Sequence, residues 1–184
     1  TEVWIVPAAD PTAEPILVKA RQKGVEYRVD IRDSELFILT NDTHVNFRLA
    51  RTTLDKPNTW QTVIVGSNEF YLTDFQLFED FFVTEGRLNG LDQIQLRNYD
   101  APGKASAIDF PEASYTAGLS NNPEYAVTKL RLSYQSMVTP RTVFDYHLAN
   151  NTLEQLKQQE IPSGYDRDHY VTERLMIEAR DGTK

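Results

Sequence analysis

Cysteine is absent from this chain of 184 residues, which excludes disulfide bonds, thiol nucleophiles and zinc or iron–sulfur sites held by cysteine. No run of about 18 apolar residues occurs, and the mean hydropathy is −0.48, so no transmembrane helix is predicted. Basic residues are in the minority, because 19 Lys and Arg stand against 27 Asp and Glu and give a formal net charge of −8. This charge repels phosphate backbones, so we expect neither nucleic acid nor a membrane as a partner. With no cysteine and no signal-like start, the sequence favours the cytoplasm.

The residue patterns that carry catalysis, cofactors or metals are missing as well. The histidines are far apart and form no H-x-H or H-x-x-x-H pair, so structural or exposed roles are expected for His44, His147 and His169. No glycine belongs to a phosphate-binding loop, and the nearest approach to a nucleophile elbow, from Gly118 to Asn122, lacks its second glycine. Two carboxylate pairs are typical of solvated turns: Glu79 with Asp80, and Asp166 with Asp168. The sequence therefore predicts no catalytic residue, no cofactor and no metal site.

Both ends of the sequence have the character of interrupted structure. Thr1 replaces the expected methionine and opens a strand-like run without any lead-in. At the other end, Asp181 and Gly182 supply the positive φ angles of a tight hairpin turn, but no second strand follows them. We therefore expect this chain to be a piece of a longer protein.

What the sequence does contain is a series of short β-type runs. Aromatic residues make up 11% of the chain and stand beside β-branched neighbours, whereas helical periodicity is almost absent. Turn-forming pairs and triplets separate most of the runs, among them Asn89-Gly90 and Asn150-Asn151. The sequence predicts an all-β fold with strands at 25–31, 36–41, 47–53, 60–65, 70–77, 81–84, 91–97, 115–119, 127–134, 142–148 and 170–177.

The spacing of these runs predicts a β-propeller. Tyr27, Tyr71 and Tyr115 follow one another at 44-residue intervals, and each introduces four short strands and a turn-rich joint. A period of about 40–50 residues with four strands per unit is the signature of propeller blades. The predicted partial propeller covers 1–160, about three and a half blades: the outer strands of one blade in 1–20, then blades at 25–66, 70–110 and 114–160.

The end of the last predicted blade carries a conflicting signal. Thr152 and Gln155, with leucines between and after, resemble the start of a capped amphipathic helix. We predict a strand instead, because Asn150-Asn151 closes a hairpin where the repeat requires one. Residues 161–169 contain Pro, Gly and charges and are predicted to be a linker or hinge, while 170–178 alternate again and are predicted to open a second domain.

Two strings near the C-terminus resemble a known family. The string Tyr134-Gln-Ser-Met-Val-Thr-Pro-Arg-Thr-Val-Phe144 is similar to Y-S-S-x-x-x-P-x-x-x-[FY] in the last propeller blade of the prolyl oligopeptidase family, with Gln135 in place of the first Ser. The string Ile161-Pro-Ser-Gly-Tyr-Asp, followed by Tyr170 and by Thr172-Glu-Arg-Leu-Met-Ile-Glu-Ala-Arg-Asp-Gly182, resembles the passage from propeller to hydrolase domain in the oligopeptidase B (protease II) branch. Thr1-Glu-Val-Trp-Ile and Asn46-Phe-Arg-Leu also resemble that propeller.

The resemblance implies a cytoplasmic two-domain serine peptidase in which a seven-bladed propeller restricts access to short, unfolded peptides. The oligopeptidase B branch cleaves after Arg or Lys, and its triad lies in a hydrolase domain that would begin within 170–184 and continue beyond this chain. We therefore expect this chain alone to be inactive, its partners to be that domain in cis and, through the whole enzyme, short basic peptides. The interdomain hinge is expected at Pro162, Gly164, Asp166, Arg167 and Asp168.

Other interpretations remain open from the residues alone. A non-enzymatic propeller or β-sandwich that binds proteins or glycans would share the same strand pattern, and a small complete β-barrel enzyme is disfavoured only because no convergent polar group is visible. The net charge suits attraction of basic peptides as well as it suits solubility. Because half a propeller exposes blade faces that are normally covered, we also expect the chain to self-associate.

Overall fold

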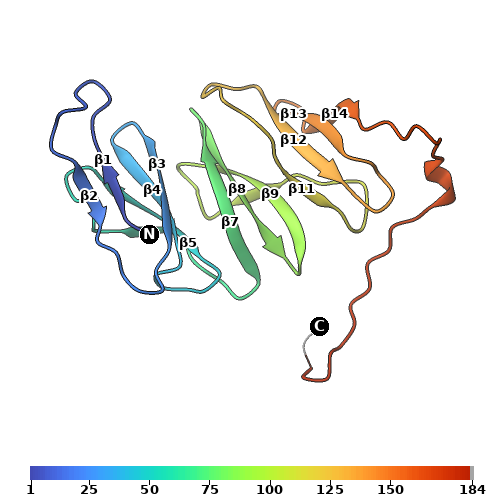
Figure 1. Ribbon diagram of the computed structural model, residues 1–184, viewed down its shortest axis with the longest axis horizontal. Helices are drawn as coiled ribbons and strands as arrows, with labels where there is room; N and C mark the ends of the chain where they lie inside the picture. The colour runs from blue at the N-terminus through green and yellow to red at the C-terminus, as the bar shows by residue number, and fades with distance from the viewer. Residues whose placement is uncertain (183–184) are drawn as a thin grey trace. The chain divides into compact units, whose positions relative to one another are not determined.

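The computed structural model describes residues 1–182 as β-sheets joined by short turns, with a single turn of 3-10 helix at Arg167–His169. Neighbouring strands pair antiparallel in every sheet (Figure 1). The chain divides into two compact units, the first made of 1–107 with 124–126, the second of 108–123 with the residues from 127 onward. No helix in the described part of the chain has the length and hydrophobicity to cross a membrane.

The first unit holds one two-stranded and two four-stranded sheets. The small sheet pairs β1 (Val3–Ile5) with β2 (Ile16–Lys19). The next sheet consists of β3 (Tyr27–Arg32), β4 (Glu35–Thr40), β5 (Arg48–Thr53) and β6 (Gln61–Ile64) in chain order. The third consists of β7 (Phe70–Leu77), β8 (Phe81–Leu88), β9 (Leu91–Asn98) and β10 (Ala105–Ala107), again in chain order.

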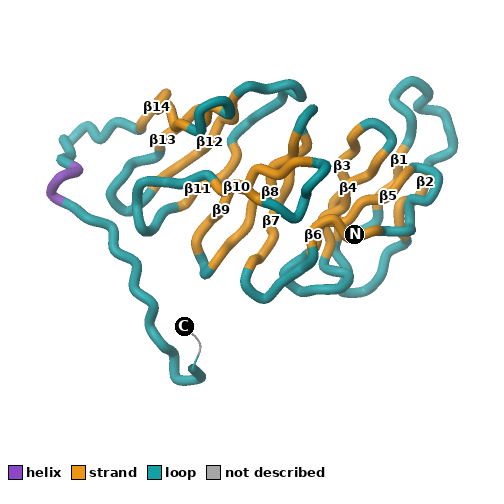
Figure 2. The backbone as a smooth tube through the Cα atoms, turned by 180° about the vertical axis from the view of Figure 1, so that it is seen from behind, coloured by secondary structure: helices purple, strands orange, loops and turns teal. Residues whose placement is uncertain are grey.

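The second unit holds one four-stranded sheet and the C-terminal tail. Its strands are β11 (Thr116–Leu119), β12 (Lys129–Gln135), β13 (Thr142–His147) and β14 (Thr152–Gln158). Figure 2 shows the tail leaving β14 and passing through the single short helical turn. The predicted all-β fold and partial propeller are confirmed, and each stretch predicted as a blade contains one four-stranded sheet.

Turn residues close these sheets in the way that their backbone freedom allows. Asn89 and Gly90 both have positive φ, 51° and 78°, and join β8 directly to β9. Asn151 (φ 56°) closes the hairpin between β13 and β14. Residues 152–158 are accordingly a strand, as the hairpin argument predicted, and the capped-helix alternative is wrong. The mostly exposed side chains of β14 explain why this strand tolerates so many polar residues.

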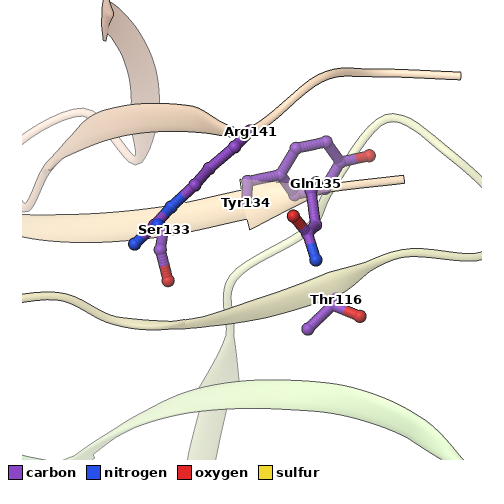
Figure 3. A pocket seen from close by; sticks show the side chains of 5 residues that line it. All are labelled: Thr116, Ser133, Tyr134, Gln135 and Arg141. Atoms are coloured by element: carbon purple, nitrogen blue, oxygen red, sulfur yellow. The ribbon is translucent and has the colours of Figure 1, made fainter. Parts of the chain in front are cut away.

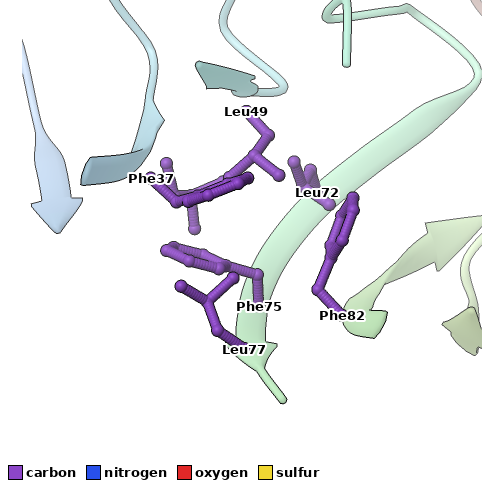
Figure 4. Close-up of a cluster of buried hydrophobic side chains, with 7 residues drawn as sticks. Phe37, Leu49, Leu72, Phe75, Leu77 and Phe82 are labelled. Atoms are coloured by element: carbon purple, nitrogen blue, oxygen red, sulfur yellow. The ribbon is translucent and has the colours of Figure 1, made fainter. Parts of the chain in front are cut away.

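Burial of both faces explains the unbroken apolar run in β4. Leu36 and Ile38 pack with Val18 of β2 on one face, in a buried group that includes Tyr27 and Ala50. The other face carries Phe37 and Leu39, which join a cluster formed with the following sheet (Figure 4): Phe37, Leu39, Leu49, Leu72, Phe75, Leu77 and Phe82. Alternation is lost in β4 because this strand has no solvent face.

The three tyrosines of the 44-residue repeat lie near the start of each four-stranded sheet, but their side chains do not occupy equivalent positions. Tyr27 opens β3, Tyr71 is the second residue of β7, and Tyr115 lies just before β11. The Tyr27 hydroxyl is buried, donates to the Lys19 carbonyl oxygen at 2.6 Å and accepts from the Val3 amide at 2.9 Å. Tyr71 is 40% exposed. The period therefore reflects the length of a four-stranded sheet rather than a shared packing position.

The strand expected at 170–178 is not formed in the structure. These residues belong to no sheet among residues 1–182. A β-strand is stabilised by backbone hydrogen bonds to a neighbouring strand, so alternation of side chains alone does not form one. The Asp181-Gly182 turn is present, with Gly182 at φ 84° and its amide bonded to the Ala179 carbonyl at 3.0 Å. That this tail opens a hydrolase domain stays a prediction.

Candidate functional site

The tail that follows β14 begins with a fixed turn. Pro162 lies in this turn, and the Gly164 amide donates to the Ile161 carbonyl oxygen at 3.0 Å. Gly164 has a φ of 82°, a conformation that side chains disfavour, so glycine is favoured there. Two of the residues predicted as a hinge thus build one compact bend.

The next predicted hinge residues form the 3-10 turn. The Asp166 carboxylate accepts a hydrogen bond from the Asp168 amide at 3.0 Å and so caps the turn at its first free donor. The His169 ring lies 3.4 Å from the same carboxylate. Arg167 starts the turn, and its guanidinium reaches Glu112 in the loop before β11.

The loop between β12 and β13 forms the surface that receives this tail. The Ser136 hydroxyl accepts from the amides of Val138 (2.9 Å) and Thr139 (2.7 Å), and the Ser136 amide donates to the Thr139 carbonyl at 2.9 Å. These bonds bend residues 136–139 tightly. As a result the Val138 carbonyl accepts from the Tyr165 hydroxyl, and the Thr139 hydroxyl bonds to Glu112.

Glu112 is the residue on which tail and loop converge. One carboxylate oxygen, Oε1, accepts from the Thr139 hydroxyl and from Arg167 Nη2, the latter at 2.8 Å. The other, Oε2, accepts from the Thr172 hydroxyl at 3.3 Å. The Glu112 side chain is only 9% exposed, so these partners replace water around its charge. We call Glu112, Thr139, Arg167 and Thr172 the Glu112 cluster.

An aromatic group lies beside this cluster. Tyr134 stacks on Phe110 at 5.2 Å between ring centroids and meets Phe144 edge-on at 5.8 Å, while Tyr115 completes the group. Burial, followed by the nearby charge of Glu112, raises the pKa of the Tyr134 hydroxyl to about 12. This hydroxyl is buried and has no hydrogen-bond partner. The Tyr134 ring therefore contributes packing to the aromatic group.

The opposite side of the same strands is polar. A pocket of about 230 Å³ is lined by Thr116, Ser133, Tyr134, Gln135 and Arg141. Figure 3 shows Ser133 and Gln135 pointing to one side of β12, toward Thr116 on β11, with Arg141 running toward Ser133. Neighbouring residues on β12 and β13 form ion pairs.

Those ion pairs centre on Asp145, a buried carboxylate on β13. Arg131 Nε lies 2.9 Å and Lys129 Nζ 2.5 Å from its two oxygens. The hydrogen bonds from Arg131, and then those from Lys129, hold the pKa of the Asp145 carboxyl below its usual value.

In the first unit, an ion pair joins neighbouring sheets. Arg28 of β3 pairs with Asp74 of β7 and donates to the Phe75 carbonyl at 2.5 Å.

The histidines do not converge. His44 Nδ1 accepts from the Asn46 amide at 3.0 Å, and His147 Nε2 lies 2.8 Å from the Glu154 carboxylate. With His169 beside Asp166, each ring thus has a partner close to it in sequence. Among residues 1–182, no group of three His, Asp or Glu side chains is arranged to hold a metal ion.

The sequence predicts the hinge residues of the tail but not Glu112, the residue to which the tail is bonded. Glu112 was not singled out, because it lies 55 and 60 residues from Arg167 and Thr172 and no local pattern links them. The two C-terminal strings with family resemblance were the available signal. In the structure, these strings touch, through Tyr165 and Val138 directly and through Glu112 indirectly.

Comparison with known proteins agrees with the observed fold and with the family resemblance of the two C-terminal strings. Residues 1–159 match the family described as "Prolyl oligopeptidase, N-terminal beta-propeller domain". The chain therefore belongs to the prolyl oligopeptidase family.

Individual relatives support the same assignment. The chain is 36% identical to dipeptidyl aminopeptidase BI of Pseudoxanthomonas mexicana over 99% of its length and 25% of that protein. It is 29% identical to protease 2 of Moraxella lacunata over 100% of its length and 26% of that protein. Oligopeptidase B from Trypanosoma brucei with covalently bound antipain superimposes with a TM-score of 0.83 at 28% identity, covering 92% of this chain and 25% of that one. The chain thus spans about a quarter of the length of the curated relatives it matches.

Proposed function

We propose that this chain is the non-catalytic propeller portion of a serine oligopeptidase that cleaves short peptides after Arg or Lys. The observation that carries the proposal is the match of residues 1–159 to the family's propeller domain. Similarity to protease 2 and to oligopeptidase B favours the branch with basic specificity. In this proposal the propeller filters substrates by size, and a hydrolase domain in the same polypeptide supplies the catalytic groups.

The charge of the chain supports a preference for basic peptides. A net charge of −8 produces a negative field that attracts cationic substrates over distances longer than a hydrogen bond. The same charge disfavours nucleic acid. We place the enzyme in the cytoplasm, where a chain without cysteine loses nothing to the reducing environment.

The test is a substrate panel on the intact enzyme, meaning this chain together with the polypeptide that follows it. Three fluorogenic amides are compared by kcat/KM: an N-terminally blocked peptide with Arg before the scissile bond, the same blocked peptide with Pro, and an unblocked dipeptide. The proposal predicts preference for the blocked Arg substrate. Preference for Pro, or for the unblocked dipeptide that the name dipeptidyl aminopeptidase describes, would contradict it.

The isolated chain provides the matching control. We expect it to hydrolyse none of the three amides, because the catalytic groups are assigned to the domain that follows. Turnover by the purified chain that is blocked by a serine-directed inhibitor would place a catalytic serine within these 184 residues and refute the assignment.

We also propose that the isolated chain self-associates through its first sheet. Trp4 on β1 is 56% exposed, and Val6, two residues further along the chain, is also exposed. Apolar groups gathered at an open sheet are typical of surfaces that are covered in the complete protein. Sedimentation velocity tests this: we expect a concentration-dependent shift that Trp4→Ser weakens, and a monomer at all concentrations would contradict it.

A further inference from the structure

The tail, in which residues 161–169 are predicted to be a hinge, is attached to two loops of the second unit at three points. The Tyr165 hydroxyl bonds to the Val138 carbonyl, Arg167 bonds to Glu112 at 2.8 Å, and Thr172 bonds to the other oxygen of Glu112 at 3.3 Å. The 3-10 turn lies between the first and last of these attachments. The turn cannot swing away from the loop before β11 and the loop between β12 and β13 unless these bonds break.

The strength of this attachment comes from the burial of Glu112. A carboxylate that is 9% exposed loses most of its hydration, so removal of Arg167 would leave a buried and poorly paired charge. Arg167 itself is 54% exposed and would return to water at little cost. Release of the tail is therefore opposed mainly by the cost of leaving the Glu112 carboxylate unpaired. Hydrogen bonds to an ionised group are also stronger than those between neutral groups.

The residues after Thr172 are in a different situation. Residues 173–178 belong to no sheet in the described part of the chain, and the side chains of Leu175, Met176 and Ile177 are more than half exposed. A bend in this stretch would break none of the contacts that fasten 165–172.

We propose that Glu112 is a latch that fastens the tail to the loop before β11, so that the pivot toward the following domain lies beyond Thr172 and not in 161–169. The proposal rests on the proposed function, which supplies the following domain. Pro162 and Gly164 then form a fixed bend, and Asp166 and Asp168 keep the 3-10 turn in the shape that aims Arg167 at Glu112. Opening of the latch would move the pivot back toward Gly164 and allow a wider separation of the domains.

Hydrogen exchange of the 184-residue chain tests the latch without any enzyme activity. In Glu112→Gln we expect the amides of residues 168–170 to exchange about tenfold faster, because a charge-assisted hydrogen bond that holds their turn is lost. Glu154→Gln is the matched control, since Glu154 also pairs with a basic side chain in the second unit but has its partner, His147, on β13. Unchanged exchange in Glu112→Gln, or equal acceleration in the control, would overturn the latch.

Two further variants keep the test valid if Glu112→Gln folds poorly. Arg167→Gln removes the exposed partner and should accelerate the same amides, with no additional acceleration when both substitutions are combined. Thr172→Val should also accelerate exchange, whereas Thr172→Ser keeps the hydroxyl and should restore the parent rate. Additive effects of the two charge variants, or failure of Thr172→Ser to restore protection, would show that the residues act separately.

The intact enzyme tests the consequence for the pivot. We expect Glu112→Gln to raise kcat/KM for a long peptide, relative to a tripeptide with the same cleavage site, by about tenfold, the population shift that one such bond allows. A parallel loss for both substrates would indicate a purely structural role and refute the pivot. If the intact parent protein cleaves neither substrate, the proposed function fails while the exchange result still decides whether the latch exists.

Discussion

Replacement of Phe82 by alanine should strongly destabilise the first unit. Phe82 on β8 is fully buried, and its ring centroid lies 6.0 Å from that of Phe37 on β4 and 5.4 Å from that of Tyr99. Removal of a buried phenylalanine side chain costs about 3–5 kcal/mol in free energy of unfolding, because transfer and cavity terms add. The two aromatic contacts are lost together with the burial, so we expect a value in the upper half of that range.

Urea unfolding of the 184-residue chain, followed by circular dichroism, measures this loss. Phe81→Ala is the control, since Phe81 is next to Phe82 on the same strand but only partly buried, where it stacks on Phe78 at 4.9 Å. We expect the control to cost about 1–2 kcal/mol, in proportion to the smaller area that it buries. Equal losses for the two variants would refute the conclusion that the sheet-to-sheet cluster around Phe82 holds the first unit together.

Three further outcomes follow from charge and backbone geometry. The pKa of Asp145 is lowered by Arg131 in the folded chain, so the stability that it contributes is present above about pH 4, the unfolded pKa, and is lost as pH falls through the folded pKa; urea titrations in steps from neutral pH to pH 2 should show this loss, and Asp145→Asn should show less of it. In Gly86→Ala the new methyl group would lie 2.6 Å from a backbone oxygen, so thermal unfolding should reveal a destabilisation of about 1–3 kcal/mol, whereas Gly103→Ala, with open space around it, should stay within about 0.5 kcal/mol; the opposite order would contradict the packing. In the intact enzyme, kcat/KM for Arg peptides should fall as salt is raised, and a salt-independent value would show that the acidic field plays no part.

The fold could be predicted because it depends on local patterns. The sequence predicts a strand at 36–41, and the structure forms β4 there, with a buried group on each of its sides. Asn151 could be assigned to a hairpin because few residues adopt its positive φ. In each case the information lies within a few residues of the element that it specifies.

The candidate site could be predicted only in part, because its central contact is not local. The sequence singled out Arg167, but its partner Glu112 lies 55 residues away, and neither residue belongs to a pattern that would pair them. The strand predicted at 170–178 fails for a similar reason. Alternating side chains indicate two different faces, but they do not show whether a neighbouring strand is present to pair with.

The most direct test of the central claim, that this chain filters substrates for a peptidase with basic specificity, is one competition experiment on the intact enzyme. A tripeptide amide with Arg at the cleavage site, the same tripeptide with Pro, and an unfolded protein that contains the Arg site are offered together, and their kcat/KM values are compared. The account predicts that the Arg tripeptide is cleaved and that the Pro tripeptide and the protein are strongly disfavoured. Equal cleavage of the Arg site in the tripeptide and in the protein, or preference for Pro, would contradict it.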